Sequence, residues 1–141
     1  MAGASRTITI NAPIEKVFDI ITDYAKYPQF LSDMSGANIK SKNGNIAEVT
    51  FELKLVMAIK YTLRLVETRP TSVKWTMIDG QMMKSNDGGW DLKALGPNQT
   101  EATYTIEVAV KGLVPKSVST GLIDVTLPRT LDAFKKRAET V

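Results

Sequence analysis

Alternation between apolar and polar residues runs through most of the chain after residue 46. Every second residue is apolar in the segments 47–55, 59–65, 73–77 and 102–110, and mostly polar residues stand between them. This period of two is typical of β-strands that bury one face and expose the other. Turn signals such as Asn43-Gly44 and Asp79-Gly80 separate the segments, so the strands are predicted to pair antiparallel.

Three further segments complete the predicted sheet. Residues 6–10 alternate near the start of the chain, and residues 37–41 precede the Asn43-Gly44 turn. Residues 84–95 contain Trp90 and Leu92, and a β-bulge is expected at 87–89. A sheet of about seven strands with one apolar face must curl around whatever it buries.

Helical periodicity appears before and after these strands. Pro13 is expected at the first position of a short helix, and a second short helix is expected over 24–34, broken by Pro28. A long helix is predicted from about 115 to 139, with a kink where Pro128 lacks the N–H that would bond to the carbonyl of Asp124. One apolar stripe follows its whole length: Ile123, Leu127, Leu131, Phe134 and Ala138. A second stripe lies only before the kink: Val118, Leu122 and Val125.

These elements predict one α+β domain over residues 1–141. A curved antiparallel sheet wraps around the long C-terminal helix, and two short helices follow the first strand. A helix is about 10 Å wide, which is too narrow to fill the concave side of such a sheet, so we expect an internal cavity. Inward positions are expected to line this cavity and bind its ligand: Phe51, Leu53, Tyr61, Leu63, Trp75, Met77, Trp90, Tyr104, Ile106, Ile123 and Leu127.

Some of these positions have two interpretations. Tyr61 and Tyr104 are either core residues whose hydroxyls reach an edge or hydrogen-bond donors for the polar end of a ligand. Lys84 and Asn86 would face inwards on a regular strand, but burying a lysine is costly, so we expect the bulge to turn both outwards. Flexible thioethers either fill the core or line the pocket, and four methionines are candidates: Met57, Met77, Met82 and Met83.

The composition excludes several kinds of chemistry. The chain has no Cys and no His, which rules out disulfides, thiol nucleophiles and Ser-His pairs, and we expect no metal and no cofactor. The net charge is only +3, and the one dense basic cluster, Lys135-Lys136-Arg137, suits a helix C-terminus, so no nucleic acid partner is expected. The chain shows neither a leader pattern nor an apolar run near the ~20 residues that span a bilayer. We therefore expect a cytoplasmic protein without a transmembrane segment.

Several short motifs follow one another in a characteristic order. The opening strand precedes Ala12-Pro13-Ile14-Glu15-Lys16-Val17-Phe18, Asp23 and Tyr27-Pro28-Gln29-Phe30-Leu31. Later come Asp79-Gly80, Gly88-Gly89-Trp90 and Ala133-Phe134-Lys135-Lys136-Arg137-Ala138. In this order the chain resembles the START and Bet v 1-like (SRPBCC) superfamily, more narrowly its polyketide cyclase/dehydrase and coenzyme Q-binding branch. The resemblance implies a helix-grip fold that holds a lipid-, quinone- or polyketide-like ligand between the sheet and the C-terminal helix.

We therefore expect binding or transport of a hydrophobic small molecule rather than catalysis, and two alternatives stay open. A polyketide cyclase or aromatase would fold its substrate by the shape of the pocket, assisted by a tyrosine or a lysine. A ribosome- or protein-interaction module is implied by relatives that are described as acting on ribosome assembly. The apolar face of residues 118–125 would form a gate, be covered by the short helices, or make transient contact with a membrane or a protein.

Overall fold

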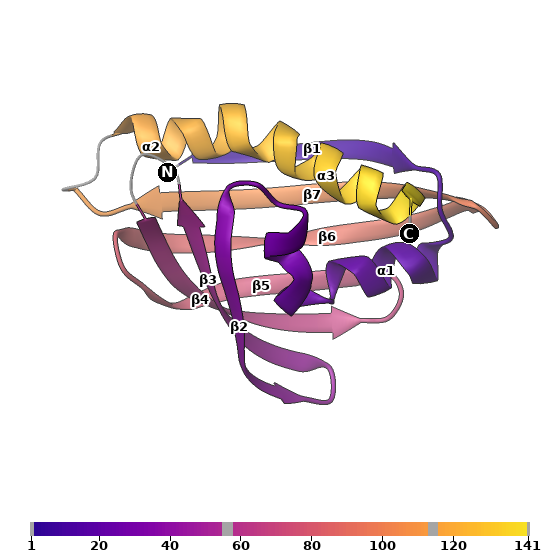
Figure 1. Ribbon diagram of the computed structural model, residues 1–141, viewed down its shortest axis with the longest axis horizontal. Coiled ribbons are helices and arrows are strands. Elements are labelled where there is room, and N and C mark those ends of the chain that lie inside the picture. Colours follow the sequence, from indigo (N-terminus) through magenta and orange to yellow (C-terminus); the bar gives the residue numbers. More distant parts are fainter. Residues whose placement is uncertain (1, 55–57, 113–115, 141) are drawn as a thin grey trace.

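The computed structural model describes residues 2–54, 58–112 and 116–140, and its central element is one sheet of seven strands (Figure 1). Neighbouring strands are antiparallel in the order β1-β7-β6-β5-β4-β3-β2, which confirms the predicted sheet. The strands are β1 (Ala2–Ile10), β2 (Met34–Asn43), β3 (Ile46–Lys54), β4 (Ala58–Thr68), β5 (Ser72–Gly80), β6 (Met83–Gly96) and β7 (Gln99–Val110). Met57, the expected strand end at residue 55, the expected helix start at residue 115, and the side chains of Val118 and Leu122 lie outside the described part of the chain.

The alternation in the sequence corresponds to the two faces of this sheet. Phe51 of β3 lies opposite Tyr61 of β4, and both side chains are buried on the concave face. On the convex face of the same two strands Glu48 lies opposite Arg64, and the two charged groups approach to 3.0 Å. The parity predicted for both strands is confirmed.

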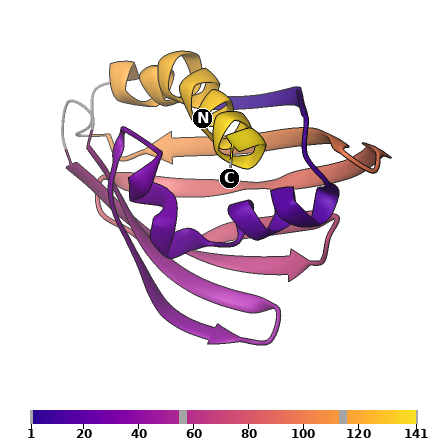
Figure 2. The ribbon, with the colours of Figure 1, turned by 45° about the vertical axis from the view of Figure 1, so that its right-hand side comes forward.

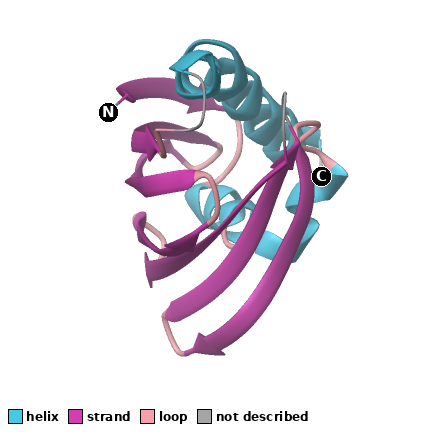
Figure 3. Ribbon diagram, turned by 90° about the vertical axis from the view of Figure 1, so that its left-hand side faces the viewer, coloured by secondary structure: helices cyan, strands magenta, loops and turns pink. Residues whose placement is uncertain are grey.

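The sheet curves around the C-terminal helical segment (Figure 3). This segment consists of α2 (Lys116–Gly121), the π-helical turn η2 (Leu122–Thr126) and α3 (Leu127–Thr140). The buried residues of α3 are the predicted apolar stripe: Leu127, Leu131, Phe134 and Ala138. Within the described ranges, the helices are too short or too polar to cross a membrane.

A π-helical turn stands where the sequence predicts a kink at Pro128. Proline has no N–H, so the carbonyl of Asp124 cannot accept the usual bond from four residues further on. A π turn pairs each carbonyl with the N–H five residues on, which offers that carbonyl a different donor. The helix therefore continues past Pro128 through a locally widened turn, Leu122–Thr126.

Two short helices lie beneath the C-terminal helix on the concave side of the sheet (Figure 2). α1 (Ile14–Ile21) begins one residue later than expected, with Pro13 as its N-cap. η1 (Tyr24–Gln29) is a 3-10 helix and is shorter than the predicted 24–34 segment. The N–H groups of Phe30 and Leu31 both bond to the carbonyl of Tyr27, at 3.2 and 2.9 Å, which ends the helix and leads the chain into β2.

The basic cluster near the C-terminus joins α3 to its surroundings. Lys135 Nζ donates to the carbonyl of Thr9 at 2.6 Å, and Arg137 donates to Gln29 Oε1 at 3.2 Å. The Arg137 guanidinium also lies over the ring of Phe30, with Cζ 5.2 Å from the ring centroid. These contacts dock the helix onto β1 and η1.

β5 and β6 separate partway along their length. They pair from Ser72 to Trp75 of β5, where Gly88 is the last partner on β6. Beyond this point β5 continues beside β4, while β6 continues beside β7. The predicted bulge at 87–89 is wrong, because β6 pairs with β7 without interruption from Ser85 to Ala94, and the register shifts lie on either side of this stretch, between Met83 and Ser85 and between Ala94 and Gly96.

Candidate ligand-binding cavity

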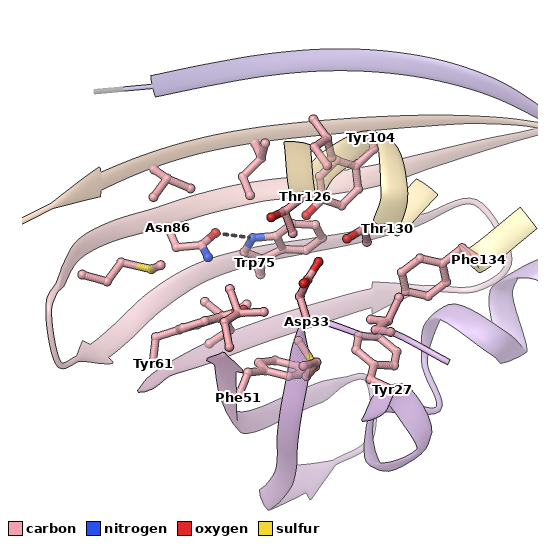
Figure 4. A pocket seen from close by; sticks show the side chains of 18 of the residues that line it. Tyr27, Asp33, Phe51, Tyr61, Trp75, Asn86, Tyr104, Thr126, Thr130 and Phe134 are labelled. Atoms are coloured by element: carbon pink, nitrogen blue, oxygen red, sulfur yellow. Dashed lines mark hydrogen bonds between the residues drawn. The ribbon is translucent and has the colours of Figure 1, made fainter. Parts of the chain in front are cut away.

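A cavity of about 100 Å³ lies between the concave face of the sheet and the C-terminal helical segment. Strands β3 to β7 supply most of its wall, and η2, α3 and residues 27–34 supply the rest. In Figure 4, Tyr27 and Phe134 stand at one end of the cavity and Asn86 at the other. The lining is mainly apolar and aromatic, which is typical of sites for apolar small molecules.

Of the eleven residues that the sequence predicts around the cavity, nine line it. The lining includes Phe51, Leu53, Tyr61, Leu63, Trp75, Trp90, Tyr104, Ile106 and Leu127. These positions share the inward parity of the strands or the sheet-facing side of α3. Their role in binding a ligand remains a proposal, which we develop below.

Met77 and Ile123 are the two expected residues that do not line the cavity. Met77 lies on the part of β5 that has already left β6, and its side chain turns along the strand. A Cβ atom on Gly80 would lie only 2.9 Å from the Met77 sulfur. Ile123 is buried on η2 one turn before Leu127, so it belongs to the core beside the cavity.

Aromatic rings form the wall beneath α3. Phe134 makes an edge contact with Trp90 at 5.3 Å between centroids, and Trp90 makes another with Tyr104 at 4.8 Å. On the other side Phe134 contacts Tyr27 at 5.2 Å. Edge-to-face pairs of this kind add to the stability that burial provides, so this end of the cavity is rigidly packed.

The four tyrosines divide into two pairs. The hydroxyl of Tyr24 donates to Glu67 Oε2 at 2.8 Å, and that of Tyr27 donates to the carbonyl of Ile21. Tyr61 and Tyr104 line the cavity and make no side-chain hydrogen bond to another described residue. Burial raises the pKa of Tyr61 and of Tyr104, so both hydroxyls keep their protons at neutral pH and offer O–H donors to the cavity.

Asn86 lines the cavity, although it was predicted to face outwards. It is only 4% exposed, and its Oδ1 accepts a hydrogen bond from Trp75 Nε1 at 3.1 Å (Figure 4). The register shift between Met83 and Ser85 leaves Lys84 exposed and restores a regular strand before Asn86. Its parity with Trp90 was the signal in the sequence, and the misplaced bulge concealed it.

Polar side chains from two elements surround the mouth of the cavity. Asp33 and Thr130 line both the cavity and a shallow depression outside it, where Arg129 lies. The Nε atom of Arg129 is 3.4 Å from Oδ2 of Asp33. Thr126, which is 7% exposed, adds a further hydroxyl to the wall nearby. Asp33 precedes β2 and the other residues lie on η2 and α3, so they are far apart in the sequence and no local pattern indicates that they come together.

The seven-stranded curved sheet and the long C-terminal helix give this chain a START-like, helix-grip fold. The likeness extends over nearly the whole molecule. A START superfamily protein from Mycobacterium smegmatis superposes with a TM-score of 0.86 at 19% identity and covers 97% of both chains. The Zhui aromatase/cyclase from a Streptomyces species superposes with a TM-score of 0.84 at 14% identity, over 98% of this chain and 93% of that one.

More narrowly, the chain belongs to the family described as polyketide cyclase/dehydrase and lipid transport, whose model matches residues 1–139. A curated relative is named ribosome association toxin RatA, from Pseudomonas aeruginosa. It is 25% identical over 136 residues, which cover 95% of this chain and 93% of the relative.

Proposed function

We propose that this protein binds and carries, in the cytoplasm, a hydrophobic small molecule of lipid, quinone or polyketide type. The observation that supports this proposal is the apolar cavity between sheet and helix, about 100 Å³ in volume. Burial of apolar ligand surface supplies roughly 25 cal/mol per Å², so a ligand must bury about 330 Å² of apolar surface to gain the roughly 8 kcal/mol that corresponds to micromolar affinity. The family to which the chain belongs is described in part by lipid transport, which agrees with this proposal.

The polar groups of the cavity favour binding over acid–base catalysis. A tyrosine hydroxyl is protonated at neutral pH, and burial raises the pKa of Tyr61 and of Tyr104 still further, so neither is available as a phenolate base. Of the described residues lining the cavity, Asp33 is the carboxylate, and it lies at the mouth beside Arg129. Asp33 is therefore the candidate base for a cyclase reaction, and loss of turnover in Asp33→Asn would support that alternative.

Two measurements on the unmodified protein test the binding proposal. Native mass spectrometry of freshly purified protein should show a bound small molecule that organic solvent removes. Titration with diphenylhexatriene, an apolar fluorophore, should give a saturable signal at micromolar concentration and alter tryptophan emission, because Trp75 and Trp90 line the cavity. The proposal would be refuted if the purified protein carried no bound molecule and also showed no saturable binding of the fluorophore.

Association with the ribosome is the second candidate function. Relatives named for ribosome association match almost the full length of this chain. Sedimentation of the protein with ribosomes through a sucrose gradient tests it directly. Cosedimentation that persists at high salt, where nonspecific attraction between charges is screened, would support this candidate. Protein that stays at the top of the gradient would contradict it.

A further inference from the structure

We propose that the carboxamide of Asn86 determines which ligand the cavity accepts, and that it selects apolar molecules carrying a carbonyl-type oxygen. This inference rests on the proposed function, since it concerns the ligand of the same cavity. It adds a residue and a chemical class that the family description does not supply.

The orientation of the Asn86 amide follows from its neighbour. Indole Nε1 carries a hydrogen and can only donate, so the atom of Asn86 that lies 3.1 Å from Trp75 Nε1 must be the carbonyl oxygen. The amide nitrogen Nδ2 then points the other way. Trp75 thus removes the usual ambiguity between the two ends of an asparagine amide.

The Nδ2 group of Asn86 faces the cavity. Within the described part of the chain, Nδ2 donates no hydrogen bond, and no fully enclosed side-chain N or O atom lacks a partner. Nδ2 is therefore not fully enclosed, although the residue is only 4% exposed and lines the cavity. Removing an amide N–H from water without a partner is unfavourable, so a ligand that accepts its hydrogen bond gains a directed contact.

Asn86 occupies the place where β5 and β6 stop pairing. The backbone ladder ends at Trp75 and Gly88, and the side-chain bond from Trp75 to Asn86 joins the two strands just beyond. Oδ1 of Asn86 satisfies the buried indole N–H of Trp75, and Nδ2, at the other end of the same amide, is not used in this contact. The polar pair therefore gives the end of the cavity a donor whose position is fixed by Trp75.

The other polar groups in the interior of the cavity are hydrogen-bond donors, as Nδ2 of Asn86 is. Tyr61 and Tyr104 also offer O–H donors, whereas the carboxylate of Asp33 lies at the mouth and faces Arg129. Amide N–H groups donate and cannot accept, so a protonated ligand amine, which has no lone pair to accept a hydrogen bond, would leave Nδ2 unpaired. A buried carboxylate would have to lose its hydration, which is costly among apolar walls. A neutral ketone, quinone or ester oxygen meets both conditions.

Three ligands of nearly equal size and shape test this inference: tetralin, tetralol and tetralone, which carry no oxygen, a hydroxyl and a ketone. Each competes with diphenylhexatriene for the cavity. For the unmodified protein we expect tetralone to bind at least about tenfold tighter than tetralin, the effect of one buried hydrogen bond, with tetralol between them. Asn86→Leu should remove the preference for tetralone and change tetralin affinity by less than about threefold.

Trp75→Phe serves as the matched variant, because it keeps an aromatic wall and releases the amide from its fixed orientation. It should weaken the preference for tetralone less than Asn86→Leu does. A preference for tetralone that survives in Asn86→Leu overturns the inference and leaves the proposed function standing. Failure of all three ligands to displace the fluorophore from unmodified protein counts against the proposed function itself.

A measurement without substitution covers the case in which the variants do not fold. The side-chain amide of Asn86 gives its own pair of proton–nitrogen NMR signals. On saturation with tetralone, we expect the chemical shifts of these signals to change more than those of other cavity residues. On saturation with tetralin, we expect them to change no more than those of other cavity residues. Saturation with tetralone that leaves the Asn86 amide signals in place overturns the inference.

Discussion

Arg129 and Asp33 face each other across the mouth of the cavity, with Nε 3.4 Å from Oδ2. The arginine side chain is 51% exposed and the aspartate side chain 18%, so the pair is partly screened by water. Ion pairs this exposed contribute little to stability, typically below about 1 kcal/mol. Their position instead connects β2 to α3 at the place where a ligand would enter.

Removal of this ion pair should speed ligand entry. We expect Arg129→Gln to raise the association rate of diphenylhexatriene about two- to fivefold, an order-of-magnitude value for one weak surface pair, with little change in the urea midpoint. Stopped-flow fluorescence measures the rate. Lys136→Gln is the control, because it breaks a pair with Asp132 on α3 away from the mouth. Equal rates in Arg129→Gln and the unmodified protein would contradict a role at the mouth.

Leu63 distinguishes a true cavity from a packed core. It lines the cavity from the middle of β4, so in Leu63→Trp the larger ring can enter free space and unfolding free energy should fall by less than about 1 kcal/mol. Diphenylhexatriene binding should be lost, because the ring occupies the ligand's volume. Leu92 is equally buried but does not line the cavity, so Leu92→Trp should cost about 1–3 kcal/mol. Similar losses of stability in both variants would show that Leu63 is ordinary core.

Gly88 is required by the close approach of β6 to β7. A Cβ atom at this position would lie 2.1 Å from the carbonyl oxygen of Thr105, so Gly88→Ala should lower the unfolding free energy by more than about 2 kcal/mol. Gly96→Ala is the control, since nothing lies within 4 Å of its added Cβ, and it should change stability by less than about 1 kcal/mol. Denaturant unfolding compares the two, and a tolerated Gly88→Ala would contradict the register of this strand pair.

Because Tyr61 and Tyr104 are buried, we expect the free energy of unfolding to fall in alkaline solution. Burial raises the pKa of Tyr61 and Tyr104 above the ordinary value of 10.0. Above that pH the unfolded chain loses these protons and the folded chain keeps them, so stability is complete below about pH 10 and falls as the pH rises further. Phenolate absorbance should therefore appear together with unfolding. Double substitution to Phe at positions 61 and 104 should flatten the decline. Full ionisation of all tyrosines near pH 10 in folded protein would rule this out.

Backbone protection should differ along the C-terminal helical segment. The π turn Leu122–Thr126 interrupts the regular ladder, and Gly121 and Thr120 before it are weak helix formers. We expect amides over residues 116–126 to exchange faster than those over residues 129–137, and to slow when tetralone or diphenylhexatriene fills the cavity. Hydrogen exchange followed by mass spectrometry measures both halves. Equal protection of the amides in the two halves would contradict the expectation that residues 116–126 open more readily than residues 129–137.

Most of the fold could be predicted because strand parity is local. Phe51, Tyr61 and Leu63 face inwards since their neighbours in sequence are polar, and a period of two leaves no other choice of face. The stripe from Leu127 to Ala138 predicted the buried side of α3 for the same reason, with a period near 3.6. The cavity itself followed from geometry, because one helix cannot fill the concave side of a long curved sheet.

The tertiary structure decided what parity could not. Asn86 faces the cavity because the register shift of β6 lies at Met83 and Ser85, a position set by pairing with β7. Met77 does not line the cavity because β5 has already left β6 at that point. Asp33, which precedes β2, meets Arg129 of α3 only in the folded chain. Periodicity along one strand or helix assigns a face to each residue, but the residues that share a cavity are determined by pairing and packing between distant segments.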